Sequence, residues 1–290
     1  MYKRQPLDYG TLHSKKDVLF FNRNSTLGRF EVEKMKAQGY KIVVDVDDYW
    51  NLPSTHYLNQ KTKSYMESEI PSYLRLADIV TVTTPELAYQ VMKYNKNVVV
   101  VPNALPFDQG QFTKSEDKSA GSSVVYVAGA SHRHDSKMMG TGAFDSNLTL
   151  AGYEDKHPEW IEMKKYFPKA LYKGAKPAQS YMSLYDGHKI AVAPLVEDEF
   201  NICKSNLKVL EAGAKGLPII CSPTLPYLNL KDKDAVLFAE TPSDWSYLVD
   251  KLQKDEGFYR QTSEALSEHV RTHYQLRDSN KIRQQIFDSF

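Results

Sequence analysis

Three charged side chains between residues 200 and 222 have the types and spacing for binding chemistry. Lys204, Lys208 and Glu211 follow i, i+4, i+7 spacing, which predicts that they share one face of a helix. An apolar stripe beside them would hold this helix against a core: Leu207, Leu210 and Ala214. Two cations and one acid on a rigid face would suit a ligand with two phosphates and a ribose. The alternative is a solvated helix face with an ordinary charge pair.

A second candidate is the loop that follows the predicted strand 124–128. Gly129 would let the backbone approach a ligand closely, Arg133 supplies positive charge, and backbone amides at such a turn bind phosphate well. His132 and His134 flank Arg133, and Asp135 could orient one of them. A purely structural loop is the alternative. A zinc site is disfavoured because no further ligands stand at metal-binding spacing.

Carboxylates form the third candidate group. Asp45, Asp47 and Asp48 lie at the carboxyl end of a predicted strand, where three acids are costly unless they bind something or cap a helix. Asp47 or Asp48 could orient an acceptor hydroxyl. The acidic residues 197–199 precede the predicted Lys/Glu helix, where the helix dipole alone would favour them.

Composition bounds the class of protein. The chain has 290 residues, is 41% hydrophobic and 25% charged, and carries a formal net charge of +1. These values indicate a soluble globular protein of about two ordinary domains, without the charge of a polyelectrolyte binder. The first forty residues are more basic, which is compatible with an anionic acceptor. Cys203 and Cys221 lie in apolar contexts, which favours the reducing cytoplasm. No apolar run of membrane-spanning length is visible.

Strands and helices alternate in two blocks. In the first block, strands are predicted at 17–23, 41–45, 77–83 and 97–102, and helices at 25–38, 62–76 and 84–94. In the second, strands are predicted at 124–128, 148–152, 189–194, 217–221 and 235–239, with helix beyond 241. We expect an α/β fold of two Rossmann-like domains facing across a cleft. The predicted boundaries are 1–107, a linker at 108–122, 123–271, and a C-terminal helix at 272–290.

Several common motifs are missing. The sequence has no Gly-x-x-x-x-Gly-Lys-Ser/Thr run, no Gly-x-Gly-x-x-Gly after the first strand, and no Gly-x-Ser-x-Gly elbow. A P-loop nucleotidase, a dinucleotide oxidoreductase and an α/β-hydrolase are therefore disfavoured.

A family resemblance extends over most of residues 41–222. The strand 190–195, Phe200-Asn, Lys204-Ser and Lys208-Val-Leu-Glu-Ala-Gly-Ala-Lys-Gly-Leu-Pro-Ile resemble the donor-binding signature of GT-B glycosyltransferases, close to glycosyltransferase family 4 (group 1). Asp45-Val-Asp-Asp-Tyr-Trp50 and residues 77–87 and 99–104 resemble segments of the acceptor domain.

The resemblance implies a retaining transferase that uses a nucleotide-diphosphate sugar, most simply a UDP-sugar, without a metal or other cofactor. Glu211 would bind the donor ribose, and Lys204 or Lys208 the diphosphate. The predicted catalytic residues are Lys208, Arg133 and Asp47. The predicted donor-binding residues are Gly129, Ser131, His132, Lys204, Ser205 and Glu211, and Asp45 and Asp48 are placed on the acceptor side. The helical tail would cross back to the first domain.

One departure and several alternatives accompany this interpretation. The family has a second acid eight residues before Glu211, where this chain has Cys203, and Glu199 is out of register. The acceptor is expected to be a glycan or a hydroxymethylated base in viral DNA, the latter implying the host cytoplasm. The alternatives are a catalytically silent GT-B-like scaffold protein and a sugar-nucleotide epimerase.

Overall fold

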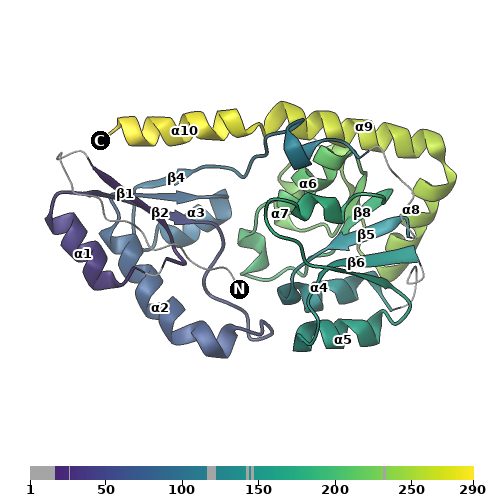
Figure 1. Ribbon diagram of the computed structural model, residues 1–290, viewed down its shortest axis with the longest axis horizontal. Helices are drawn as coiled ribbons and strands as arrows, with labels where there is room; N and C mark the ends of the chain where they lie inside the picture. The colour runs from purple at the N-terminus through teal and green to yellow at the C-terminus, as the bar shows by residue number, and fades with distance from the viewer. Residues whose placement is uncertain (1–16, 26, 116–121, 142–143, 145–146, 231–232) are drawn as a thin grey trace.

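The computed structural model consists of two α/β units that lie side by side (Figure 1), and it describes residues 17–25, 27–115, 122–141, 144, 147–230 and 233–290. The first unit is a parallel sheet in the order β1-β2-β3-β4. Its elements are β1 (Val18–Asn22), α1 (Arg29–Ala37), β2 (Lys41–Val46), α2 (Asn59–Leu76), β3 (Ile79–Val82), α3 (Pro85–Val91) and β4 (Val98–Val100).

Both faces of this first sheet are covered, which explains its continuous β-branched strands. Val44 packs in one cluster with Val32 of α1 and Ile70 of α2. Val43, its neighbour in β2, points to the opposite face and packs with Ile286 near the C-terminus. A strand buried on both faces cannot show the apolar–polar alternation of a half-exposed strand, so its sequence is apolar throughout.

The second unit is a six-stranded parallel sheet in the order β10-β9-β8-β5-β6-β7. Its elements are β5 (Val124–Val127), α4 (Arg133–Ser136), β6 (Leu148–Tyr153), α5 (Pro158–Tyr166), β7 (Leu171–Gly174), β8 (Ile190–Ala193), α6 (Leu207–Lys215), β9 (Ile219–Cys221), α7 (Leu225–Leu228) and β10 (Leu237–Phe238).

The sequence analysis does not predict α5 or β7. Helix α5 has clear start signals, because His157 caps it by accepting a hydrogen bond from the Glu159 N–H, and Pro158 stands in the first turn. Strand β7 is a short edge strand whose Leu171 is exposed, so it carries no buried apolar run.

The helix predicted across Lys204, Lys208 and Glu211 is shorter than expected, and this corrects the one-face prediction. Lys204 has an extended backbone (φ −67°, ψ 158°), and α6 begins only at Leu207. Lys208 and Glu211 therefore share α6, whereas Lys204 lies in the connection before it. Helical spacing fails here because a 3₁₀ turn, Asn201–Cys203, interrupts the segment.

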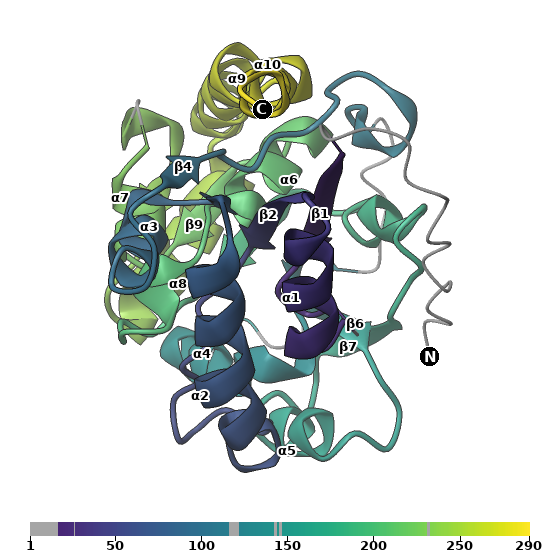
Figure 2. The same ribbon diagram turned by 90° about the vertical axis from the view of Figure 1, so that its left-hand side faces the viewer.

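Three helices complete the chain: α8 (Pro242–Lys254), α9 (Glu256–His273) and α10 (Leu276–Asp288). Helix α9 packs on α6 at Gly213, where an added Cβ would lie 2.7 Å from the Val270 side chain. Helix α10 continues beyond α9 and returns over the first unit (Figures 1 and 2). A parallel bridge between Leu105 and Gln275 marks this return. The α/β class and the arrangement of two units with a crossing helical tail are thus confirmed.

Some predictions fall partly outside the described part of the chain. In the predicted linker, the structure shows a 3₁₀ turn at Gly110–Phe112, while residues 116–121 lie outside the described residues. Part of the basic N-terminal stretch also lies outside them, including Lys3, Arg4, Lys15 and Lys16. Among the described helices, none has the length and apolar character required to cross a membrane.

Candidate active site

A cavity of about 330 Å³ opens between the two units, at the carboxyl ends of their strands. The first unit contributes residues 53–56, which follow β2 in the chain. The second contributes the loop after β5, with Ser131 and His132, and the loop after β8, with Asp198, Asn201 and Lys204. The elements that surround it are therefore those that the parallel topology brings to one edge of each sheet.

The loop after β5 begins with open space beside Gly129. A Cβ built on Gly129 would meet no atom other than Ser131 Oγ, at 4.0 Å. The backbone of this loop can thus be approached closely by a ligand. Gly152, near the end of β6, has no such space beside it. Its φ is +101°, and a Cβ there would lie 2.2 Å from the carbonyl oxygen of Ala128. The start of the loop therefore rests directly on β6.

Arg133 in the same loop points toward α5. Its Nε forms an ion pair with Glu159 Oε2 at 2.5 Å, and its Nη2 lies 3.0 Å from His134 Nε2. Ser131, His132 and His134 line the cavity, whereas Arg133 does not. The structure therefore separates the arginine from the neighbours that the sequence analysis grouped with it.

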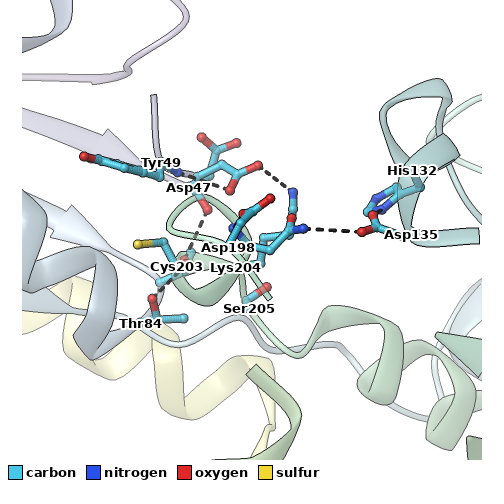
Figure 3. A network of polar contacts seen from close by, with 12 residues as sticks. Asp47, Tyr49, Thr84, His132, Asp135, Asp198, Cys203, Lys204 and Ser205 are labelled. Carbon is cyan, nitrogen blue, oxygen red and sulfur yellow. Dashed lines mark hydrogen bonds and ion pairs between the residues drawn. The ribbon is translucent and has the colours of Figure 1, made fainter. Parts of the chain in front are cut away.

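His132 and Asp135 form a close pair at the cavity wall (Figure 3), with 2.7 Å between His132 Nδ1 and Asp135 Oδ2. Asp135 is buried, and its Oδ1 accepts hydrogen bonds from the Val196 N–H (2.9 Å) and from Asn201 Nδ2 (3.3 Å). Burial lowers the pKa of His132, although the bond to Asp135 opposes this effect. The imidazole is therefore neutral near pH 7.

Lys204 links the two units. Its Nζ lies 3.1 Å from Asp48 Oδ2 and 4.3 Å from the centre of the Phe200 ring. His56 from the first unit packs edge-on against Phe200, with ring centroids 5.8 Å apart. Lys204 thus lines the cavity as a cation that is already paired with Asp48 of the first unit.

Lys208 and Glu211 lie on α6, outside the lining of this cavity. Glu211 is buried, and Tyr185 Oη donates a hydrogen bond to its Oε2 at 2.6 Å. Burial lowers the pKa of the Lys208 amine, the charge of Lys204 lowers it further, and Glu211 acts in the opposite direction. The predicted pair therefore forms a cation and an acid in close electrostatic contact beside the cavity.

The three acids at the carboxyl end of β2 have different surroundings. Asp45 accepts hydrogen bonds from Thr81 Oγ1 (2.7 Å) and Asn22 Nδ2 (3.3 Å), which ties neighbouring strands together. Asp47 pairs with Arg23, with 3.0 Å between Oδ1 and Nε, and Asp48 pairs with Lys204. Only Asp48 reaches the second unit through these contacts.

The position at which a second acid is expected is occupied by Cys203, a packing residue. Cys203 is fully buried in the hydrophobic cluster of the first unit, and its carbonyl accepts a hydrogen bond from Thr84 Oγ1 at 3.0 Å. Burial raises the pKa of its thiol to about 12.

Glu199 accepts a hydrogen bond from Tyr49 Oη at 3.4 Å, and Ser205 Oγ accepts one from Asn103 Nδ2 at 2.7 Å. These contacts hold the two units together.

The sequence analysis gave no site role to several cavity residues, among them His56 and Asn201. His56 lies in a loop formed by residues 51–58. This loop contains Asn, Pro and Ser and follows the acidic end of a predicted strand, and these features could have indicated that it lies at the edge of the sheet. Asn201 stands in the Phe200-Asn segment of the family signature, but its contact with Asp135, 66 residues away, leaves no local signal. Among the described residues, no group of three or more His, Cys, Asp or Glu side chains is arranged to hold a metal ion.

Comparisons with known proteins show the family and the fold of the chain. The model of a family described as glycosyl transferase-like matches residues 133–281, just over half of the chain. A search of curated protein sequences found no significant match.

Solved structures with the same architecture include three glycosyltransferase-type proteins. Sucrose-phosphate synthase from Thermosynechococcus elongatus has a TM-score of 0.66 at 13% identity, covering 94% of this chain and 74% of that one. A glycosyltransferase from Rickettsia africae has a TM-score of 0.67 at 12% identity, covering 94% and 76%. HepE from Anabaena in complex with UDP and glucose has a TM-score of 0.69 at 10% identity, covering 94% and 78%. At these identities the likeness shows a shared GT-B fold.

Proposed function

The chain belongs to the glycosyl transferase-like family, and from that premise we propose that it transfers a sugar from a nucleoside diphosphate sugar to an acceptor hydroxyl. One observation supports this most directly: Lys204 and Lys208 lie beside a loop whose Gly129 backbone is open to close approach. Such an arrangement can receive a diphosphate and stabilise the negative charge that develops on it as the sugar departs.

On the donor side, Glu211 binds the ribose hydroxyls, with Tyr185 holding the carboxylate in place. Lys208 and Lys204 bind the diphosphate, with Lys204 exchanging Asp48 for phosphate oxygens. Gly129, Ser131, His132 and Ser205 complete this side. Arg133 can bind the diphosphate only after its ion pair with Glu159 breaks. We therefore assign it a smaller contribution to diphosphate binding than Lys204 and Lys208. UDP-sugars are the first donors to test, because HepE was solved with UDP and with UDP-glucose.

On the acceptor side, Asp47 and Asp48 lie at the end of β2, and residues 53–56 form the wall of the cavity that faces the donor loop. Asp47 is about half exposed, so one carboxylate oxygen can receive a hydroxyl. Holding acceptor and donor in one cavity supplies the orientation that group transfer needs. The acceptor is a glycan hydroxyl or a hydroxymethylated base in DNA, and transfer proceeds with retention.

The first test is ligand binding. Thermal unfolding is measured with UDP, GDP and ADP and with their sugars, since a ligand that binds only the native state raises the midpoint. UDP and a UDP-sugar are expected to raise it. Glu211→Gln should weaken UDP affinity by about tenfold, roughly 1.4 kcal/mol. The exposed pair Lys254–Asp250 offers a matched control, Lys254→Gln, which should bind UDP like the wild type.

The second test is turnover. Labelled UDP-sugar is incubated with glycan acceptors and, separately, with hydroxymethylated DNA. Transfer to glycan alone would eliminate the DNA acceptor. Cys203 at the position of the expected acid favours a second candidate, a donor-binding protein without catalysis. UDP binding without release of UDP from any sugar donor would establish that alternative.

A further inference from the structure

His132 and Asp135 form a pair whose chemistry goes beyond donor binding. Asp135 is fixed by three contacts: His132 Nδ1 at 2.7 Å, the Val196 N–H at 2.9 Å and Asn201 Nδ2 at 3.3 Å. A carboxylate that is held in this way cannot turn away from the imidazole. Because a carboxylate accepts hydrogen bonds, the proton of the neutral imidazole resides on Nδ1.

This tautomer leaves the lone pair of His132 on Nε2. The His132 side chain is 17% exposed and lines the cavity between the units. Within the described residues, Nε2 makes no hydrogen bond, whereas Nδ1 is occupied. The ring therefore presents a single unoccupied acceptor atom on the side of the protein that binds the donor.

Charged and titratable groups surround this ring on every side. They are Asp135 on its own loop, Lys204 and Lys208 near α6, His56 from the first unit, and Tyr126 beneath the ring at 6.4 Å between centroids. The two lysines and burial favour the neutral ring, and Asp135 favours the charged one. A neutral imidazole is ready to accept a proton.

The other acid at the cavity wall is less suited to this role. Asp198 lines the cavity, but its Oδ1 accepts the Asn201 N–H at 2.7 Å. Cys203, which replaces the family acid, is buried in the hydrophobic cluster of the first unit and does not line the cavity, and burial raises the pKa of its thiol to about 12. His132 is therefore better placed than either group to take a proton.

Building on the proposed sugar transfer, we propose that His132 Nε2 accepts the proton of the acceptor hydroxyl and that Asp135 positions the ring. As the O–H bond breaks, the acceptor oxygen bonds to C1 of the sugar on the same face from which the β-phosphate departs, and the C1–O bond to the β-phosphate breaks, so that the configuration at C1 is retained. The leaving nucleoside diphosphate keeps the electron pair beside Lys204 and Lys208. The imidazolium then loses its proton to water, which restores the neutral ring.

The kinetic test compares His132→Gln with the wild type across pH 5–9. General-base catalysis predicts a loss of about 100- to 10,000-fold in kcat/KM and the disappearance of the acidic limb. UDP affinity should change much less than kcat. His273→Gln, on the exposed end of α9, serves as the histidine control. Asp135→Asn should shift the acidic limb as well as lower kcat, which a merely structural role would not do.

Two outcomes would overturn the assignment. One is wild-type kcat/KM in a folded His132→Gln protein. The other is an acidic limb that survives in His132→Gln but vanishes in Asp198→Asn. Circular dichroism of each variant establishes that it is folded.

A second measurement does not depend on turnover. In ¹⁵N NMR spectra of the ligand-free protein, His132 should be the Nδ1–H tautomer at pH 7.5, and UDP should perturb its Nε2 signal. The Nε2–H tautomer would refute the proposal even in an active enzyme. If the NMR result holds but no donor is turned over, the proposed sugar transfer fails instead, because His132 would then have no hydroxyl to deprotonate.

Discussion

Lys204 of the second unit and Asp48 of the first unit form an ion pair across the cleft, with 3.1 Å between Nζ and Oδ2. The contact joins Lys204, which is predicted to bind the diphosphate, to Asp48, which is predicted to lie on the acceptor side. The two residues are 156 positions apart in the sequence. The two units are therefore linked by an ion pair at the cleft.

This pair leads to a prediction about donor affinity. Asp48→Asn should tighten UDP binding by a few-fold, because Lys204 no longer has to exchange a carboxylate for phosphate. Lys204→Ala should weaken it by about tenfold. Isothermal titration calorimetry of both variants and of the double variant measures the coupling. Weaker UDP binding in Asp48→Asn would mean that the ion pair helps to build the donor site.

The effect of this pair on stability should be small. Both side chains are partly exposed, and such pairs contribute at most about 1 kcal/mol. Urea unfolding of the same variants provides this control.

Two glycines provide a matched comparison of ligand approach and protein packing. Gly129→Ala should leave stability nearly unchanged, because the new Cβ would face open space, yet it should weaken UDP binding. Gly152→Ala should lower the free energy of unfolding by more than about 1 kcal/mol, since its φ is +101° and its Cβ would collide with Ala128. Unfolding and UDP titration are measured for both. Unchanged UDP affinity in Gly129→Ala would show that no phosphate approaches this backbone.

Cys203 is predicted to be a packing residue. Cys203→Glu should not restore a catalytic acid; it should lower the free energy of unfolding by several kcal/mol, on the order of the penalty for burying an unpaired charge. Cys203→Ala is the control and should be destabilising by much less. Because burial raises the pKa of this thiol to about 12, Ellman's reagent should react with it only after unfolding. Higher activity in Cys203→Glu would contradict this prediction.

Stability should fall as the solution is acidified below neutrality. Burial lowers the pKa of His56, His132, His134 and His188 below the ordinary histidine value. The unfolded chain therefore binds protons more readily than the folded one. The stabilising contribution is complete above the unfolded pKa of about 6.5 and is lost as pH falls through the lowered folded values. Urea unfolding between pH 8 and 5 measures this loss of stability. His188→Asn should reduce the slope of the free energy of unfolding against pH. A free energy of unfolding that rises on acidification would refute this assignment.

Much of the fold was predictable because parallel strands buried on both faces leave a strong signal. The runs at 41–45 and 97–102 correspond to β2 and β4, and the Thr84-Pro85 cap begins α3 as its side-chain chemistry predicts. The edge strand β7 escaped prediction because it has little buried surface to shape its sequence.

The site was less predictable than the fold. Helical spacing predicts Lys204 on α6. In the structure, a 3₁₀ turn precedes Lys204, whose own backbone is extended, and Lys204 lies at the cleft before α6 begins. A local pattern cannot reveal this, because the turn is fixed by distant contacts, such as Thr84 with the Cys203 carbonyl and Asn201 with Asp135.

The sequence by itself determined the α/β class, the two units and the family motif from which we propose the donor-binding residues, since apolar periodicity and a contiguous motif are local properties of the chain. Only the tertiary structure decided which side chains meet. It paired Lys204 with Asp48, turned Arg133 to Glu159, buried Cys203 against the first unit and set His132 on Asp135 at the cavity wall. Most of these contacts join elements that are distant in sequence, and even the short-range pair of His132 and Asp135 is fixed by Val196 and Asn201. Their geometry follows from how the two sheets and their loops pack together.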